Sequence, residues 1–188
     1  MALNRRKQHN PHYLPALPLY LLFAVILGAC TLSHGPWPGR EADLSTAAEG
    51  YLAAFLIEPI QNGQVFCATE TLDVEQTGEA IKAFLWALCI EYYPYRGVLQ
   101  VGAGFSGPLM VYMFENEPGY LATGFALPRD GALFPGDVER IFPPAAVERM
   151  CLEDSACCSA RVYRLEGVLE GRAHEEFDLP VATKSPSS

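Results

Sequence analysis

The stretch that decides the fold reads QVFCATETLDV from Gln64 to Val74 and AIKAFLWALCIEYY from Ala80 to Tyr93. Both segments are rich in aromatic and β-branched residues, and the Gln76-Thr77-Gly78-Glu79 sequence between them suits a turn. We therefore predict a β-hairpin. The second segment is apolar on both faces from Phe84 to Ile90, so it should be a central strand that other elements cover.

The register of this hairpin can be predicted from its turn and checked by its cysteines. Pairing the strands about Gly78 sets Cys67 opposite Cys89 on one face, so a disulfide between them would confirm the alignment, since a slip of one residue moves every side chain to the other face. On the other face the same alignment pairs Phe66 with Ile90, Ala68 with Leu88, and Leu72 with Phe84.

Two features of the hairpin are candidate binding positions. Glu70 falls opposite Trp86 on an otherwise apolar face, so it is either a buried functional acid or a sign that the register is shifted or the face is open there. Tyr92, Tyr93 and Tyr95 cluster at the end of the second strand, where an aromatic patch can bind a partner. Packing at the edge of the core is the alternative role for these tyrosines.

The rest of the chain predicts helices and further strands. A helix is expected from Ser45 to Glu58, with capping-box spacing at Thr46 and Glu49, and Pro59 should end it. The remaining expected elements are strands at Val98–Val101, Leu109–Glu115, Tyr120–Leu127 and Arg161–Leu169, and short helices at Asp137–Phe142, with Asp137 as its N-cap, and Ala145–Leu152.

This order of elements predicts an α+β fold, in which one amphipathic helix packs on an antiparallel sheet of about four to five strands and short helices follow. Cystatin-like and NTF2-like folds are similar in this order, which implies no function. The stretch from Phe66 to Pro108 also resembles small uncharacterised bacterial proteins in three places: Phe66-Cys67-Ala68, the Trp86–Tyr93 segment, and Gly104 with Ser106-Gly107-Pro108.

The N-terminus has the pattern of an export signal. Arg5, Arg6 and Lys7 precede an apolar run, Leu19 to Cys30, that is too short to span a bilayer. It ends in Leu27-Gly28-Ala29-Cys30, which resembles the lipobox of bacterial lipoproteins. The resemblance implies that Cys30 carries fatty acids and anchors the protein to a membrane, the cell membrane or the outer membrane. An ordinary secretory signal cut near Ala29 and an uncleaved anchor are the alternatives.

These boundaries divide the chain into a signal peptide (1–29), a lipidated cysteine and tether (30–42), a single domain (43–172) and a flexible tail (173–188). The leader holds three of the 13 basic residues and none of the 22 acidic ones, which leaves the mature chain ten basic residues and a formal charge of −12. Such a surface repels phosphate backbones, so no nucleic-acid partner is expected, and membrane attachment must come from lipid.

Export places the five remaining cysteines where disulfides persist, and an odd number leaves at least one free or paired between chains. Besides Cys67 and Cys89, Cys151 can close a small loop with Cys157 or with Cys158. The alternative is that one of these three C-terminal cysteines is a redox-active thiol.

No motif supports a catalytic, cofactor or metal site. Gly102 to Gly107 matches G-x-G-x-x-G, but no helix is expected after it, and Ser106 lacks a nearby general base. The other weak candidates are a metal cluster at His174, Glu175, Glu176 and Asp178, and carboxylate pairs at Asp73/Glu75 and Glu115/Glu117.

We therefore predict an exported, membrane-anchored lipoprotein with a non-catalytic binding or envelope-structural role. Its partner is an envelope protein or a small-molecule ligand of unknown identity. The alternatives are an envelope hydrolase that uses paired carboxylates and a thiol-redox protein that uses the C-terminal cysteines.

Overall fold

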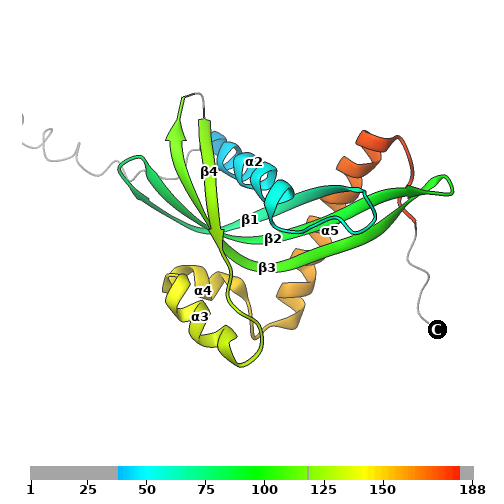
Figure 1. Ribbon diagram of the computed structural model, residues 1–188. Helices are drawn as coiled ribbons and strands as arrows, with labels where there is room; N and C mark the ends of the chain where they lie inside the picture. Colours follow the sequence, from blue (N-terminus) through cyan, green and yellow to red (C-terminus); the bar gives the residue numbers. More distant parts are fainter. Residues whose placement is uncertain (1–37, 118, 183–188) are drawn as a thin grey trace, which may run out of the picture. The chain divides into compact units, whose positions relative to one another are not determined.

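A computed structural model describes residues 38–117 and 119–182 of the chain. They form a four-stranded antiparallel sheet in the order β1-β2-β3-β4, with helices packed on it (Figure 1). The elements are α2 (Pro38–Phe55), β1 (Gln64–Thr77), β2 (Ala80–Tyr95), β3 (Val98–Asn116), β4 (Gly119–Ala126), η2 (Gly131–Leu133), α3 (Phe134–Ile141), α4 (Pro144–Met150) and α5 (Ser155–Phe177). The α+β class is confirmed.

The register of the β1–β2 hairpin is confirmed over most of its length. Cys67 lies opposite Cys89, with 4.1 Å between their Cα atoms, and the two cysteines form a disulfide. The predicted pairing of Leu72 with Phe84 is wrong, because a bulge between Thr71 and Asp73 shifts the alignment and sets Asp73 opposite Phe84. A bulge leaves its extra residue unpaired, and no local residue pattern predicted one at this position.

The central strand β2 contributes to two hydrophobic cores, one on each face of the sheet. Even-numbered residues of β2, such as Phe84 and Leu88, face α3, α4 and α5, whereas odd-numbered ones, such as Leu85, face α2. This explains why the strand is apolar on both faces. The sequence predicted a single covering helix, and the structure adds helices over the second face (Figure 1).

The C-terminal segment is the main correction to the predicted elements. Residues 161–169 were expected to form a strand, but they lie inside the helix α5, which continues to Phe177. The side chain of Asp154 accepts hydrogen bonds from the first backbone N–H groups and so caps the helix. The buried positions Arg161, Leu165, Leu169 and Ala173 recur every four residues, which is helical spacing.

The chain after α5 is also ordered, although residues 173–188 were expected to be a flexible tail. Leu99 of β3 donates to the carbonyl of Pro180 and accepts from the N–H of Ala182, so this segment pairs with the outer edge of β3. Residues 183–188 lie outside the described residues.

The first described helix starts earlier than expected. It begins at Pro38, so residues 38–42 belong to α2 and not to a tether. Proline suits the first turn of a helix, because its fixed φ is already helical and its missing N–H has no partner there. Thr46 therefore lies within the helix, where its hydroxyl bonds the carbonyl of Ala42, and it is not an N-cap. The helix ends at Phe55, before Pro59.

Asp137 is not an N-cap either, because α3 starts at Phe134 and places this residue inside the helix. Its buried carboxylate accepts hydrogen bonds from Arg129 at 2.7 Å and from Arg140 at 3.0 Å. The hydrogen bonds from Arg129, and then those from Arg140, outweigh burial and hold the pKa of Asp137 well below its usual range. The ion pairs connect α3 to the segment that follows β4.

The long strand β3 merges two predicted strands and the glycine-rich stretch between them. Gly102 to Gly107 lies within it, and the register against β2 shifts between Ile90 and Tyr92, opposite this stretch. The glycine-rich segment is thus part of a strand that contains a bulge. A strand that continues into Leu109 leaves no helix N-terminus after the glycines.

The bulge in β3 accommodates the buried side chain of Glu91. Its Oε1 accepts from the N–H of Gln61 at 2.8 Å and of Gly63 at 2.9 Å, and Oε2 accepts from Ile60 at 3.0 Å and Ala103 at 2.9 Å. Burial raises the pKa of Glu91, but the four backbone donors together outweigh it and lower the pKa from 4.5 to about 2. The carboxylate thus ties the loop after α2 to the middle of β3.

Replacing Glu91 with glutamine is expected to flatten the acid dependence of stability. The folded-state pKa lies below the ordinary value, so ionised Glu91 stabilises the fold above about pH 4.5, and this contribution is lost as the pH falls towards about 2. The variant should be less stable near neutral pH and should lose less stability across that window. Urea denaturation at several pH values gives the free energy of unfolding of each protein, and thus how it depends on pH. Parallel pH profiles for the two proteins would contradict this assignment, because Asp137 contributes equally to both.

Side chains from α2 and α5 bind backbone groups along the outer edge of β1. The N–H of Thr69 donates to Glu49 of α2 at 2.9 Å, and the carbonyl of Cys67 accepts from Arg172 of α5 at 2.7 Å. Arg172 also pairs with Glu49 at 2.8 Å, so the helices of the two faces meet around this edge. Occupied edge groups make the addition of another strand less favourable.

Candidate functional site

Three side chains form a row across the sheet on the face that α5 covers. Glu70 of β1 lies opposite Trp86 of β2, and Trp86 lies opposite Pro108 of β3. The predicted pairing of Glu70 with Trp86 is confirmed. Trp86 is only 8 % exposed and Glu70 is half-buried, so the acid lies at the border of a covered face.

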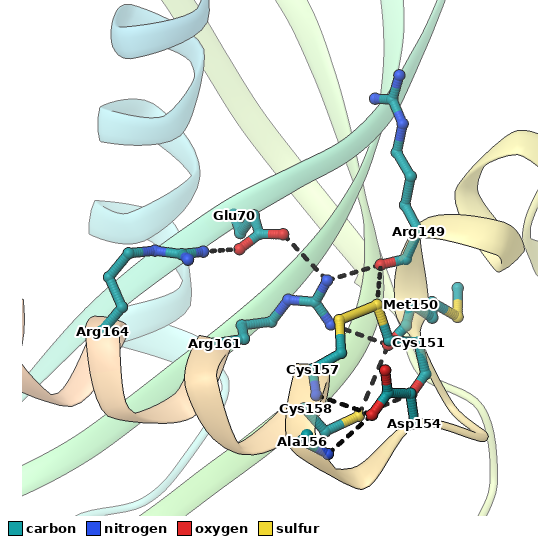
Figure 2. Close-up of a disulfide and its surroundings, with 10 residues drawn as sticks. All are labelled: Glu70, Arg149, Met150, Cys151, Asp154, Ala156, Cys157, Cys158, Arg161 and Arg164. Atoms are coloured by element: carbon teal, nitrogen blue, oxygen red, sulfur yellow. Dashed lines mark hydrogen bonds and ion pairs between the residues drawn. A yellow bond between two sulfur atoms is a disulfide. The ribbon is translucent and has the colours of Figure 1, made fainter.

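Arg161 of α5 is the centre of a polar cluster over this row. Its Cζ lies 4.9 Å from the centroid of the Trp86 ring, and its Nη2 donates to Glu70 Oε1 at 3.0 Å. The same guanidinium donates to the carbonyl of Met150 at 2.9 Å and to that of Arg149 at 2.6 Å (Figure 2). Because Arg161 is only 4 % exposed as a residue, these partners replace the water that the charge loses.

The second oxygen of Glu70 is bound as well. It pairs with Arg164, which lies one turn further along α5 and is mostly exposed, and Figure 2 shows Glu70 between the two arginines. Both carboxylate oxygens are therefore engaged by guanidinium groups. The arrangement holds α5 against β1 and keeps the Arg161 guanidinium over the Trp86 ring.

A disulfide loop fixes the start of the helix that carries these arginines. Cys151 and Cys157 form a disulfide, which is one of the two pairings that the sequence left open. Asp154, within the loop, caps α5 by accepting from Ala156 and Cys157 (Figure 2). Cys158 is free and half-buried, and its Sγ lies 3.1 Å from the carbonyl oxygen of Cys151.

Two donors of this cluster are unsatisfied. Trp86 Nε1 and Arg161 Nε are buried and have no hydrogen-bond partner within the described part of the chain. A buried donor without an acceptor is costly, and most buried polar groups in proteins are paired with protein or with bound water. Both atoms are enclosed by the surrounding residues, so the cluster bears this cost without an acceptor among the described residues.

The three candidate tyrosines are separated by the pleat of β2. Tyr92 is buried in the core beneath α5, Tyr93 is half-buried, and Tyr95 is exposed and lies under the guanidinium of Arg96. Burial raises the pKa of Tyr92, and the nearby carboxylates of α5 add to this effect. Tyr92 is thus part of the core. Of the three tyrosines, only Tyr93 and Tyr95 can belong to a surface patch at this end of the strand.

The weaker sequence candidates lie apart from this cluster. Among residues 38–117 and 119–182, no group of three His, Cys, Asp or Glu side chains is placed to hold a metal ion. The individual side chains make local contacts: Glu75 with Lys82 at 3.8 Å, Glu115 with Arg40 at 3.3 Å, Asp73 with the N–H of Val74, and His174 Nδ1 with the carbonyl oxygen of Leu179 at 3.0 Å.

Sequence reasoning missed the residues that organise the site. Arg161 and Arg164 were assigned to a strand, and neither Glu91 nor Asp137 was identified as a buried acid. The four-residue spacing of Arg161, Leu165 and Leu169 was the available signal for a helix. An arginine in the first buried position obscured that pattern, because a charged residue is normally taken to face solvent.

Comparisons of the chain with protein-family models, with curated proteins and with solved structures gave no match. None of the helices in the described ranges combines the length and the apolar character needed to cross a membrane. Cys30 and the leader lie outside these ranges, so their assignment depends on the sequence alone.

Proposed function

We propose that the chain is an exported lipoprotein, held at a membrane by fatty acids on Cys30, whose α+β domain has a non-catalytic binding role in the cell envelope. The observation that carries this proposal is the sequence Leu27-Gly28-Ala29-Cys30 at the end of a short apolar run. An acylated cysteine with two or more chains gives a stable anchor, since each buried methylene contributes about 0.8 kcal/mol.

The cysteine pairs of the domain support export. Cys67–Cys89 and Cys151–Cys157 are both at bonding distance, and disulfides of this kind persist in oxidising compartments. The acidic surface of the mature chain fits attachment through lipid, because it would not be drawn to anionic headgroups by charge.

The placement of the acids favours binding over carboxylate catalysis. The two buried acids, Glu91 and Asp137, are saturated with donors that lower their pKa values, whereas a general acid needs a raised one. Glu70 has both oxygens bound by arginines. These contacts hold structural elements together and engage the carboxylates of all three acids.

Replacing Cys30 with serine tests the anchor. In cells that process bacterial lipoproteins, the wild-type chain should fractionate with membranes, partition into detergent and have an intact mass that starts at Cys30 with added lipid. Cys30→Ser should lose the lipid and the detergent partitioning. Cys158→Ser is the matched control, since it removes the cysteine that has no disulfide partner in the described part of the chain and should leave fractionation unchanged. A wild-type mass without lipid, or unchanged fractionation of Cys30→Ser, would overturn the proposal.

A further inference from the structure

One end of the sheet presents apolar side chains that no helix of the described chain covers. On the face of α3, α4 and α5, the row of Phe84 and Met110 is the last that belongs to the core. The next rows, towards the β1–β2 and β3–β4 turns, contain Tyr112, Phe114 and Leu121, which are 43 %, 46 % and 54 % exposed. Phe114 and Leu121 lie opposite each other on β3 and β4. We call these three residues the apolar end patch.

The described chain begins at the same end of the sheet. Arg40, in the first turn of α2, binds Tyr120 of β4, and it also binds Gln76 of β1 at 2.8 Å and Glu115 of β3 at 3.3 Å. Glu115 is the neighbour of Phe114 in β3, and neighbours in a strand point to opposite faces. The start of α2 and the apolar end patch therefore lie on opposite faces of one sheet end, and Figure 1 shows α2 on one face and α3 and α4 on the other.

The proposed lipid on Cys30 would keep this end of the domain close to a membrane. Pro38 lies eight positions after Cys30, so the connecting chain extends to at most about 29 Å. The 16 residues of β2, from Ala80 at this end to Tyr95 at the other, span roughly 50 Å. The anchor thus holds the apolar end patch within reach of the bilayer, whereas the Tyr95 end can be farther away by the length of the strand.

We propose that the apolar end patch lies in the interface of the membrane to which Cys30 is anchored, as a second and non-covalent contact with lipid. Aromatic side chains and leucine are favoured at the boundary between headgroups and acyl chains. A short tether holds the two surfaces at a high effective concentration, so a patch too small to bind a bilayer alone can stay in contact. The inference rests on the proposed lipid anchor and adds which surface of the domain faces the membrane.

The charges around the patch specify the kind of membrane surface. Lys82, which lies opposite Tyr112, is paired with Glu75 at 3.8 Å. Glu79 and Glu117 lie in the two turns at this end and are exposed. Anionic headgroups would repel these acids, so the patch suits a zwitterionic lipid such as phosphatidylcholine.

Quenching by brominated lipid tests the contact, because bromine on an acyl chain quenches only an indole that comes close to it. The chain acylated in cells, with Trp37→Phe, is reconstituted in phosphatidylcholine vesicles with and without bromine. Phe114→Trp should lose a large part of its emission in the brominated vesicles. Tyr95→Trp is the matched control, since it places an indole at an exposed position of the far end, and it should emit equally in both. Trp86 is buried and contributes the same background to each variant.

A charge within the patch connects the signal to this surface. Leu121→Asp, combined with Phe114→Trp, should restore most of the emission, because a carboxylate is costly to place in lipid. Leu133→Asp makes the same change at a residue of η2 that is 50 % exposed, and it should leave the quenching unchanged. Both leucines are exposed, so neither change enters the core. Vesicles rich in phosphatidylglycerol should quench Phe114→Trp less at low salt.

Three results would overturn the proposal. The first is equal emission of Phe114→Trp in both kinds of vesicle, and the second is equal quenching of Phe114→Trp and Tyr95→Trp. The third is a dimer in detergent in which the indole of Phe114→Trp is already shielded from water, which would assign the patch to a second copy of the chain. Stronger quenching in phosphatidylglycerol would contradict the choice of a zwitterionic surface.

A second sample separates this result from the anchor. In the Cys158→Ser variant, Cys30 is the only cysteine outside the two disulfides, so it can be coupled to a maleimide lipid in the same vesicles. If cells leave Cys30 without lipid, the proposed anchor fails, and the coupled chain still shows whether the patch meets the bilayer. If Cys30 is acylated and Phe114→Trp is not quenched in either sample, the anchor stands and the patch is rejected.

Discussion

Replacing Gly102 with alanine is expected to destabilise the protein by about 3 kcal/mol and to lower its Tm by roughly 6–12 °C. A Cβ at this position would lie 2.2 Å from Oε2 and 2.7 Å from Cδ of Glu91. The φ angle of Gly102 is not in the left-handed region, so the cost is steric and does not come from backbone strain.

The carboxylate of Glu91 has no low-cost way to move aside. Its Oε2 accepts from Ile60 and Ala103, and its Oε1 accepts from Gln61 and Gly63, so any displacement breaks hydrogen bonds of a buried charge. The methyl group must therefore be accommodated either by compressing the core or by separating the loop after α2 from β3. Each route costs free energy of unfolding.

Gly63 provides an independent test of the same arrangement. A Cβ there would lie 2.5 Å from the carbonyl oxygen of Tyr92 and 2.8 Å from Cγ of Glu91, so it would meet backbone as well as side chain. Gly63→Ala should accordingly be destabilising by a similar amount, about 1–3 kcal/mol.

Gly50→Ala is the matched control for both changes. Gly50 lies inside α2, and nothing is within 4 Å of a Cβ added there. The same chemical change should therefore stabilise the helix, by about 0.5–1 kcal/mol. Urea denaturation under non-reducing conditions compares the three variants. Equal effects of Gly50→Ala and Gly102→Ala would show that the space around Glu91 is not filled as described.

The hairpin could be predicted because its register is encoded locally. Pairing about Gly78 in the turn aligned the two strands and set Cys67 opposite Cys89, without any information from distant segments. The bulge at Leu72 escaped prediction, since an extra residue in one strand depends on what packs over it. Here the carbonyl of Leu72 accepts from Arg149, which is far along the chain.

Only part of the candidate site could be predicted from the sequence. The opposition of Glu70 to Trp86 followed from the register, but the partners of Glu70 are separated from it by 91 and 94 positions. Local periodicity carries no information about such contacts. The misassignment of α5 has the same origin, because Arg161 fills a core position that becomes favourable only when Glu70, Trp86 and two carbonyls surround it.

Arg161→Gln is the second substitution with a large expected effect, a loss of about 3 kcal/mol in the free energy of unfolding. The variant removes the buried cation, leaves the carbonyls of Arg149 and Met150 without their donor, and frees one oxygen of Glu70. It also removes the group that covers the Trp86 ring. The effect should appear as a lower urea midpoint with an unchanged m value.

Arg164→Gln is the control that separates the effect of the buried guanidinium from the effect of neutralising Glu70. Arg164 is on the same helix and pairs with the same carboxylate, but its side chain is 60 % exposed against 5 % for Arg161. An exposed ion pair contributes about 0–1 kcal/mol, so this variant should unfold close to the wild-type midpoint. If both variants lost the same amount, the stabilisation would come from neutralising Glu70 and not from the enclosed guanidinium. A large difference would instead identify Arg161 as the contact that seats α5 on the sheet and holds Trp86 in place.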